Sequence, residues 1–338
     1  MNKKRVLAML LAGAMALSMT ACGGNSASTD GSSNDGGASA SGGSYKVSVI
    51  LKTLAAEYWQ YVKSGAEDYA SEHSDKVTVE VKGPSSETAF DEMQNMIETD
   101  LSSGSYDGVI ISPLQSDTAA QLVSGTKLPI VAIDTNFTAP EVKSFVGTGN
   151  EAAAKKGGEA AVEAAKAAGW TDIKCIEIAG VQGDQTNTAR MNGYKAGVEE
   201  AGGTFLSDEV QYADATADRA TTAMEAIMQT HPEGIAIICA NNDDMAMAAA
   251  RAAQGQDADM NTIFLGFNGD RAACEAILAG QMTMSVAQMA YEMGYKAVET
   301  MVQVLDGETV DEFVDSGSDV VTPDNAQERL DTLKTQLH

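Results

Sequence analysis

Polar side chains directly follow most of the short apolar runs in this chain, and their chemistry is hydrogen bonding to a small polar ligand. If the runs are strands of a parallel sheet, these residues lie outside the carboxyl ends of the strands, where ligands of such sheets bind. They are Lys52, Ser112, Asp134, Asp184, Asn241 to Asp243, Asn268 and Gln288. Because Asn and Asp also cap helices, capping is the alternative role for each of them.

Two aromatic residues and one arginine add to this set. Tyr58 and Trp59 begin a predicted helix beside the strand ends, where aromatic faces would stack on the C–H faces of a sugar; packing in the core is the alternative. Arg190 lies near the N-terminus of its predicted helix, where the helix dipole disfavours a cation. A polar ligand or a carboxylate would compensate, because the planar guanidinium suits hydroxyl pairs and carboxylates. A surface arginine is the alternative.

Motifs for catalysis, phosphate binding or metal binding are weak in this sequence or missing from it. Gly147 to Ala152 fits the dinucleotide pattern G-x-G-x-x-G/A, but Asp172 begins the next strand instead of ending it, which favours a connection between domains. The sequence holds no Walker glycine loop and no G-x-S-x-G elbow, and its histidines and cysteines lack metal-ligand spacing. We therefore expect no enzyme, no cofactor and no metal.

The stretch from Ile235 to Ala252 shows the local pattern that predicts the fold. Six apolar residues without alternation suit a strand buried on both faces of a parallel sheet, polar residues end it, and an Ala/Met-rich helix follows. The same order recurs and predicts right-handed βαβ units in two α/β halves. Strands are expected at 45–51, 77–81, 109–111, 130–133, 173–179, 209–212, 235–240, 263–267 and 283–287.

The N-terminal segment predicts export and a membrane anchor. Three basic residues precede an apolar run too short to span a bilayer, which is typical of a signal peptide. Met19-Thr20-Ala21-Cys22 resembles the bacterial lipobox, so residues 1–21 are a predicted lipoprotein signal peptide and Cys22 the lipidated residue; an ordinary secreted protein is the alternative. Residues 22–44, rich in Ser and Gly, are expected to form a flexible tether.

Charge and cysteine content limit the partners further. The chain has 22 Lys and Arg against 48 Asp and Glu, a formal net charge of -26, so a polyanion would be repelled and nucleic acid is not an expected partner. Cys175 and Cys239 lie in apolar runs and are expected in the core. A disulfide between two of Cys175, Cys239 and Cys274 remains open.

Seven segments, in their order and spacing, resemble the type 1 periplasmic sugar-binding proteins of ABC transporters, the ribose- and galactose-binding group. They are LKTLAAEYWQYVKSGA, DGVIISPLQSDTA, LPIVAIDTN, GDQTNTARMNGY, HPEGIAIICANNDDMAMAAARA, FLGFNG and SVAQMAYEMG, within Tyr45 to about Gly307. The resemblance implies an α/β fold of two Rossmann-like lobes with parallel sheets, hinged at three crossovers. The N-terminal lobe would comprise residues 45–147 plus 289–316, and the C-terminal lobe residues 148–288 plus 317–338.

Carried over by position, the family's ligand contacts fall on Lys52, Ala56, Tyr58, Trp59, Asp134, Thr135, Thr148, Arg190, Ala215, Asn242, Asn268 and Gln288. All except Ala56 and Ala215 form the predicted ligand-binding set. Ala56, Thr135, Ala215 and Asn268 depart from the ribose-type pattern, and Lys52 replaces smaller residues, which could favour an acidic or oxidised sugar. Asn241 and Asp244 are left as turn and helix cap.

The resemblance implies a monomer, anchored by lipid outside the bacterial cell membrane, that captures a small sugar or sugar-like ligand and delivers it to an ABC permease. Asp134 would accept two hydroxyl hydrogen bonds, Arg190 and Asn242 would donate from the other lobe, and Tyr58 or Trp59 would stack. Ligand would shift the population toward the closed form. A receptor for a furanosyl quorum-sensing signal or a chemotaxis ligand is the alternative function. The lactose-repressor family shares the fold, but an exported chain without a DNA-binding headpiece does not fit it.

Overall fold

A computed structural model describes residues 44–337 of the chain. The predicted signal peptide, the lipidation at Cys22 and the tether up to residue 43 lie outside the described residues. Within the described part, no helix is both long and apolar enough to cross a membrane.

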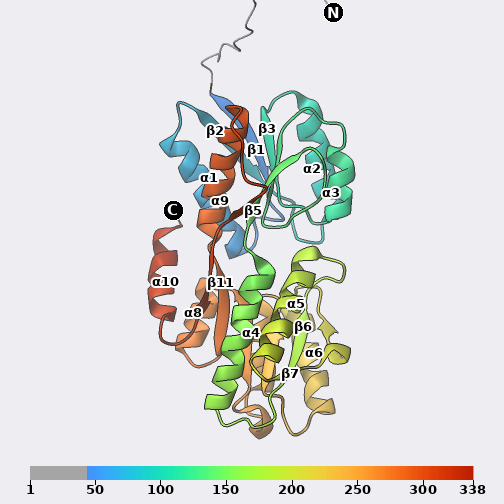
Figure 1. The fold of residues 1–338 in the computed structure, drawn as a ribbon, viewed down its shortest axis with the longest axis vertical. Helices are drawn as coiled ribbons and strands as arrows, with labels where there is room; N and C mark the ends of the chain where they lie inside the picture. Colours follow the sequence, from blue (N-terminus) through green and yellow to red (C-terminus); the bar gives the residue numbers. More distant parts are fainter. Residues whose placement is uncertain (1–43, 338) are drawn as a thin grey trace, which may run out of the picture. The chain divides into compact units, whose positions relative to one another are not determined.

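The first lobe is built on a six-stranded parallel sheet with the order β12-β5-β4-β3-β1-β2. Buried apolar runs form its centre, because helices cover both faces: α1 and α9 pack on one, α2 and α3 on the other (Figure 1). The strands are β1 (Tyr45–Ile50), β2 (Val77–Lys82), β3 (Gly108–Ile111), β4 (Ile130–Ile133), β5 (Val142–Gly147) and β12 (Phe313–Asp315); the helices are α1 (Glu57–Glu72), α2 (Phe90–Ser103), α3 (Ser116–Val123) and α9 (Ala290–Leu305).

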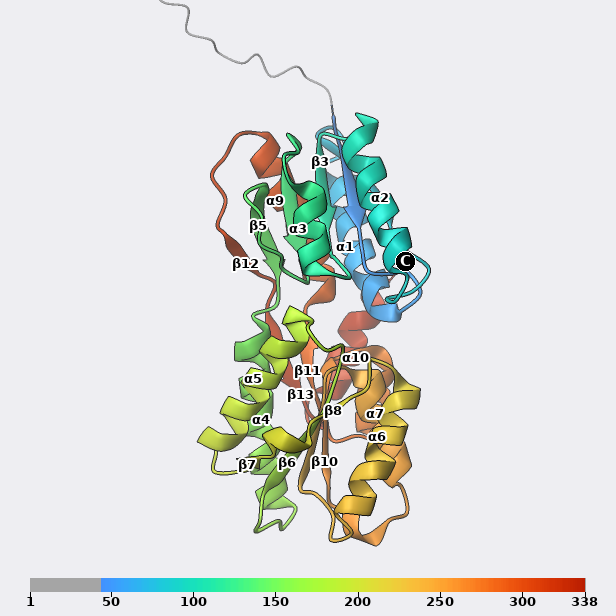
Figure 2. The same cartoon turned by 90° about the vertical axis from the view of Figure 1, so that its right-hand side faces the viewer.

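The second lobe is built on a seven-stranded sheet with the order β13-β11-β10-β9-β6-β7, in which β8 also pairs with β6. Helices α4 and α5 cover one face, and α6 and α7 the other (Figure 2). Helix α8 packs on the same side as α6 and α7, and α10 packs against α8 (Figure 1). The strands are β6 (Lys174–Ala179), β7 (Thr204–Phe205), β8 (Gln211–Tyr212), β9 (Ile237–Ala240), β10 (Ile263–Asn268), β11 (Met284–Gln288) and β13 (Ser318–Val321). The helices are α4 (Asn150–Ala167), α5 (Gln185–Glu200), α6 (Ala217–Thr230), α7 (Asp243–Ala253), α8 (Arg271–Leu278) and α10 (Ala326–Thr335), with 3-10 turns η1 (Ser207–Glu209) and η2 (Asp257–Asp259).

Three segments pass between the two sheets. They link β5 to α4 at residues 147–150, β11 to α9 at residues 288–290, and β12 to β13 at residues 315–318. The Gly-Thr-Gly stretch of the dinucleotide-like motif is therefore the first of these links. Each sheet directs the carboxyl ends of its long parallel strands toward the links, so the polar residues that follow the strands of both lobes lie in the same region.

The fold differs from the sequence prediction in a few elements. The second sheet is not purely parallel, because β13 pairs with β11 in the antiparallel sense. The strand expected at 209–212 is a 3-10 turn followed by the two-residue strand β8, and the strand expected at 235–240 begins at Ile237. The expected strands do not include β5, β7, β12 or β13, and the helix α10 is not expected either. The strands β7, β12 and β13 have only two to four residues, a pattern too short to reveal a period.

Candidate functional site

Asp134 is a buried charged residue at the carboxyl ends of the first lobe's strands. It follows β4 directly, is 5% exposed and adopts a left-handed backbone conformation with φ 63°, which Asp tolerates better than most residues. The hydroxyl of Tyr58 donates to Oδ1 and that of Thr135 to Oδ2, each at 2.8 Å. These bonds fix the carboxylate, and each oxygen retains a lone pair for a further donor.

Tyr58 and Trp59 form a buried aromatic corner beside Asp134. Their rings meet edge to face, with centroids 5.0 Å apart and an interplanar angle of 85°. The indole Nε1 of Trp59 donates to Oε1 of Glu87 at 2.8 Å. Burial, together with the Asp134 carboxylate, raises the pKa of Tyr58 well above its usual value, so its hydroxyl remains a donor at neutral pH. Tyr58 is thus buried in the core, and its hydroxyl also donates a hydrogen bond to Asp134.

Arg190 lies on the buried face of α5 and is only 6% exposed, so it is not a surface arginine. Its guanidinium carbon stands 3.8 Å from the ring centroid of Phe267, Nε donates to Oδ1 of Asn150 at 2.8 Å, and Nη1 donates to the carbonyl of Asn241 at 2.7 Å. These protein acceptors are neutral groups. The sequence prediction did not identify Asn150 or Phe267 as supports; the only available signal was the polar residue directly after Gly147-Thr148-Gly149.

Gln288 and Asn268 end the neighbouring strands β11 and β10. Nε2 of Gln288 donates to Oδ1 of Asn268 at 2.9 Å. Gln288 is 1% exposed, and its Oε1 has no hydrogen-bond partner within residues 44–337; the same is true of Oδ1 of Asn241. Because an unpaired buried acceptor costs about 1–3 kcal/mol, these oxygens mark places where a ligand could supply hydroxyl donors.

Asn242 is the N-terminal cap of α7, which corrects the assignment of the cap to Asp244. Its Oδ1 accepts from the backbone N–H of Met245 at 2.9 Å, and its Nδ2 donates to the carbonyl of Ala215 at 3.1 Å. A capping Asn and a ligand-binding Asn have the same sequence signature, so the pattern alone could not separate the two roles. Thr148 in the first interlobe link is also buried, and its hydroxyl lies 3.4 Å from that of Ser316 in the third link.

Lys52 and Thr135 of the first lobe contact the second lobe at the start of α5. Nζ of Lys52 lies 3.6 Å from Oδ2 of Asp184, and the hydroxyls of Thr135 and Thr186 lie 3.2 Å apart. Burial lowers the pKa of Lys52, but the carboxylates of Asp184 and Asp134 outweigh burial and raise it. The charge of Lys52 therefore has a partner inside the protein and does not require an acidic ligand.

A pair of coupled carboxyl groups lies behind the strand ends of the second lobe. Asp243 accepts from the hydroxyl of Ser285 at 2.6 Å and from the backbone N–H of Asp270 at 3.0 Å. Burial raises the pKa of Asp243 to about 6, and burial together with Asp243 raises that of Asp270 well above its usual value. Asn268 donates to Asp270 at 3.4 Å. The sequence prediction did not include Asp270 in the site.

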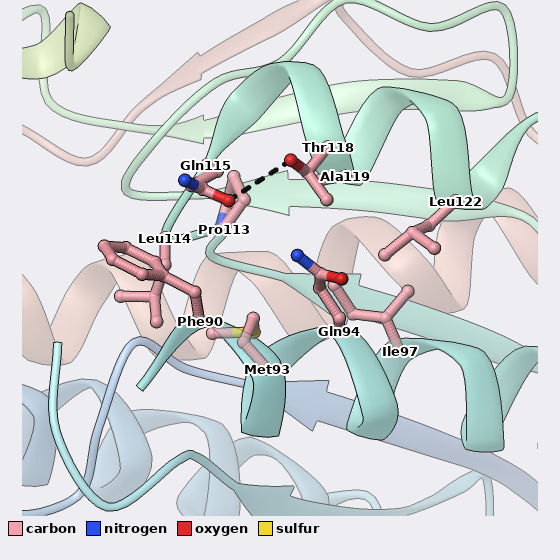
Figure 3. Close-up of a pocket in the computed structure, with 10 residues that line it drawn as sticks. All are labelled: Phe90, Met93, Gln94, Ile97, Pro113, Leu114, Gln115, Thr118, Ala119 and Leu122. Atoms are coloured by element: carbon pink, nitrogen blue, oxygen red, sulfur yellow. Dashed lines mark hydrogen bonds between the residues drawn. The ribbon is translucent and has the colours of Figure 1, made fainter. Parts of the chain in front are cut away.

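These contacts bring Lys52 and Thr135 of the first lobe against the start of α5 in the second lobe. Asn242, Asn268 and Gln288 bond to residues of their own lobe in the contacts described above. Two other hollows lie elsewhere. Figure 3 shows apolar side chains of α2 facing the segment that leads into α3, around a cavity of about 10 Å³, barely the size that one water needs. A groove of about 700 Å³ lies at the amino ends of β10 and β11, away from the strand ends just described.

Within residues 44–337 no cluster of His, Cys, Asp and Glu could hold a metal ion, and all three cysteines are buried and free.

The chain is similar to proteins that bind small solutes. Residues 47–309 match the family described as periplasmic binding protein domain. The D-allose-binding periplasmic protein of Escherichia coli strain K12 is 30% identical over 264 residues, covering 75% of this chain and 82% of that protein. The ribose import binding protein of Salmonella typhimurium strain LT2 is 26% identical over 267 residues, covering 78% and 86%.

A solved structure has the same fold. It is an ABC transporter solute binding protein from Agrobacterium vitis with bound D-fucose, and it is 23% identical. The match has a TM-score of 0.74 and covers 87% of this chain and all of that one. The prediction of two α/β lobes of the periplasmic binding protein type 1 fold is thereby confirmed.

Proposed function

This chain belongs to the periplasmic binding protein family, and from that premise we propose that it captures a small neutral sugar between its two lobes for an ABC importer. Its relatives are binding proteins, so the chain is a solute-binding protein and not an enzyme. The first lobe of the proposed trap is residues 45–147 plus 289–316, and the second is residues 148–288 plus 317–338.

The observation that carries the proposal is the set of buried, partly unsatisfied acceptors at the facing strand ends. Oε1 of Gln288 and Oδ1 of Asn241 have no partner within the described residues, and Asp134 retains lone pairs beyond its bonds to Tyr58 and Thr135. Several acceptors at the carboxyl ends of strands suit a ligand with several hydroxyl donors. Relatives named for D-allose and ribose support a sugar as that ligand.

Charge balance favours a neutral sugar over an acidic one. The cations of the proposed site are Lys52 and Arg190, and the anions are Asp134 and Asp184. Lys52 faces Asp184 at 3.6 Å, so only Arg190 is left to balance Asp134 from across the site. A ligand carboxylate would add an uncompensated charge to a buried region, which is costly.

The proposed mechanism is closure of the lobes around the sugar. Asp134 accepts two hydroxyl hydrogen bonds from the side of the first lobe. Arg190, held over Phe267, donates from the second lobe, with Asn242, Asn268, Gln288 and Thr148 in further contacts. Tyr58 or Trp59 packs on the apolar face of the sugar ring. Because the ligand touches both lobes only when they are closed, it shifts the population toward closure, which is the form the permease would recognise.

We also propose that the protein is a monomer held at the outer face of the bacterial cell membrane by lipid on Cys22. The support is the basic and apolar start of the sequence, its lipobox-like end and the Ser/Gly-rich segment that follows. That tether would let the domain turn toward its permease.

A melting-temperature screen tests the proposal. The full chain is heated with pentoses, hexoses, inositols, sugar acids and furanosyl signal molecules, since any ligand that binds only the folded state raises the melting temperature. We expect one or a few neutral sugars to give the largest rise. A largest rise from a furanosyl signal would favour the receptor alternative, and no rise from any polar ligand would contradict the proposed function.

A further inference from the structure

An ion pair joins the two lobes outside the proposed sugar contacts. Glu57 is the first residue of α1 in the first lobe, and Arg271 is the first residue of α8 in the second. Nε of Arg271 lies 2.6 Å from Oε1 of Glu57, and the hydroxyl of Tyr61 donates to the same Oε1 at 2.8 Å. Tyr61 is 1% exposed, so the first-lobe side of the pair is held in place by a core residue.

The pair is one of two ion pairs that cross between the lobes within residues 44–337. The other is Lys52 with Asp184, at the opposite end of the same β1–α1 connection. The connection is therefore tied to the starts of two different helices of the second lobe, α5 through Lys52 and α8 through Glu57. The remaining ion pairs of the described residues each lie within one lobe; Lys155 with Glu200, 2.7 Å apart in the second lobe, is an example.

We propose that Glu57 and Arg271 form a clasp that favours the closed arrangement of the lobes before ligand binds, and so raise ligand affinity without touching the ligand. The effect on affinity rests on the proposed function, whereas the effect on closure does not. The pair can form only when α1 and α8 approach each other, so it contributes free energy to the closed form and none to an open one.

The expected size of the effect is modest. The side chains of Glu57 and Arg271 are 29% and 45% exposed, so solvent screens their attraction. Exposed pairs typically change an equilibrium by at most about fivefold. The clasp should also weaken with added salt, because the Debye length falls to about 3 Å at 1 M.

Hydrogen exchange of the ligand-free full chain tests the clasp. The peptides to follow cover residues 134–136 and 185–191, which face each other across the lobes through Thr135 and Thr186 and belong to neither α1 nor α8. We expect Glu57→Gln to speed their exchange about two- to fivefold, Arg271→Gln to do the same, and the double variant to be no faster than either. Gln at position 57 can still accept from Tyr61. Lys155→Gln is the matched control and should leave these peptides unchanged.

Two outcomes would overturn the clasp: unchanged exchange in Glu57→Gln, or additive effects in the double variant, which would indicate two independent local changes. Since the measurement uses no ligand, its failure leaves the sugar-binding proposal standing. Conversely, if no sugar raised the melting temperature in the screen, the hydrogen-exchange measurement would still test the clasp.

Discussion

At the scale of single residues, Glu177 is a carboxyl group in an environment far from that of an ordinary carboxyl. It lies on β6, is fully buried, and neither carboxyl oxygen has a hydrogen-bond partner within the described residues. Burial raises its pKa to about 8, against a partial lowering by the nearby Arg190. Glu177 is therefore protonated and neutral at pH 7, so it is not the group that balances the positive charge of Arg190.

This pKa predicts a definite dependence of stability on pH. Between about 4.5 and about 8 the folded protein holds a proton on Glu177 that the unfolded chain has released, so the free energy of unfolding falls as pH rises through that window. Glu177→Gln should remove this loss and raise the free energy of unfolding at pH 8 by more than about 1 kcal/mol. Urea unfolding at pH 5 and pH 8 measures it.

Exposed Glu225 provides the control, and Glu225→Gln should change neither value. If Glu177→Gln left the difference between the two pH values as large as in the wild type, the assigned protonation would be wrong.

The residue types of the site could be predicted from the sequence, but their partners could not. Asp134 and Gln288 stand out because they directly follow apolar runs, and Arg190 because it is a cation near the start of a predicted helix. That Lys52 pairs with Asp184, or that Asn150 and Phe267 support Arg190, depends on residues far apart in the chain. For Asn242 the local pattern fitted two roles, and the structure shows the cap.

At the scale of elements, glycines allow the two helices of a pair on each sheet to approach each other closely, because they carry no side chain. On α1 and α9 in the first lobe, a Cβ added at Gly65 would meet the carbonyl of Tyr291, and one at Gly294 would meet the carbonyl of Val62. On α4 and α5 in the second lobe, Gly197 faces the carbonyl of Lys155 in the same way. These helices touch backbone to backbone, so the sheet faces below them are closely covered.

We therefore expect Gly294→Ala to destabilise the protein by about 1–3 kcal/mol, because the added methyl group pushes α9 away from α1. Thermal unfolding checks this. Gly149→Ala is the matched control: its φ is -67° and an added Cβ would have no heavy atom within 4 Å. Because Gly149 is the N-cap of α4, where Ala is less favourable than Gly, we expect a small decrease in melting temperature, below that of Gly294→Ala. Equal melting temperatures for Gly294→Ala and the wild type would contradict the packing argument.

The long elements follow from the sequence because their patterns are local. The buried runs of β3 and β4 and the helical spacing of α1 and α9 are visible without tertiary information. The edge strands β12 and β13 are not, since they exist only because each sheet offers a neighbour to pair with. The antiparallel pairing of β13 likewise follows from the last link between the lobes and not from any pattern in its four residues.

At the scale of the whole molecule, the N-terminal segment would decide where the protein acts. Cys22→Ser removes the thiol to which lipid would be attached, so we expect the variant to leave the membrane fraction of expressing bacteria, whereas the wild type stays in it. Fractionation followed by immunoblotting measures this. Cys274→Ser alters a buried cysteine of α8 and should fractionate like the wild type. A Cys22→Ser variant that remained in the membrane fraction would argue against the lipid anchor.

The central claim is that a sugar is held between facing strand ends of the two lobes, with Asp134 as the principal acceptor. Asn at position 134 tolerates the left-handed backbone but loses the charge, and hydrogen bonds to a charged group contribute roughly 1.5–3 kcal/mol each. Exposed Asp117 on α3 gives the matched control, Asp117→Asn.

Calorimetric titration of the best sugar from the melting screen tests this claim most directly. The account predicts that Asp134→Asn binds that sugar at least tenfold more weakly than the wild type, while Asp117→Asn binds as the wild type does. Equal affinity of Asp134→Asn and the wild type would contradict it.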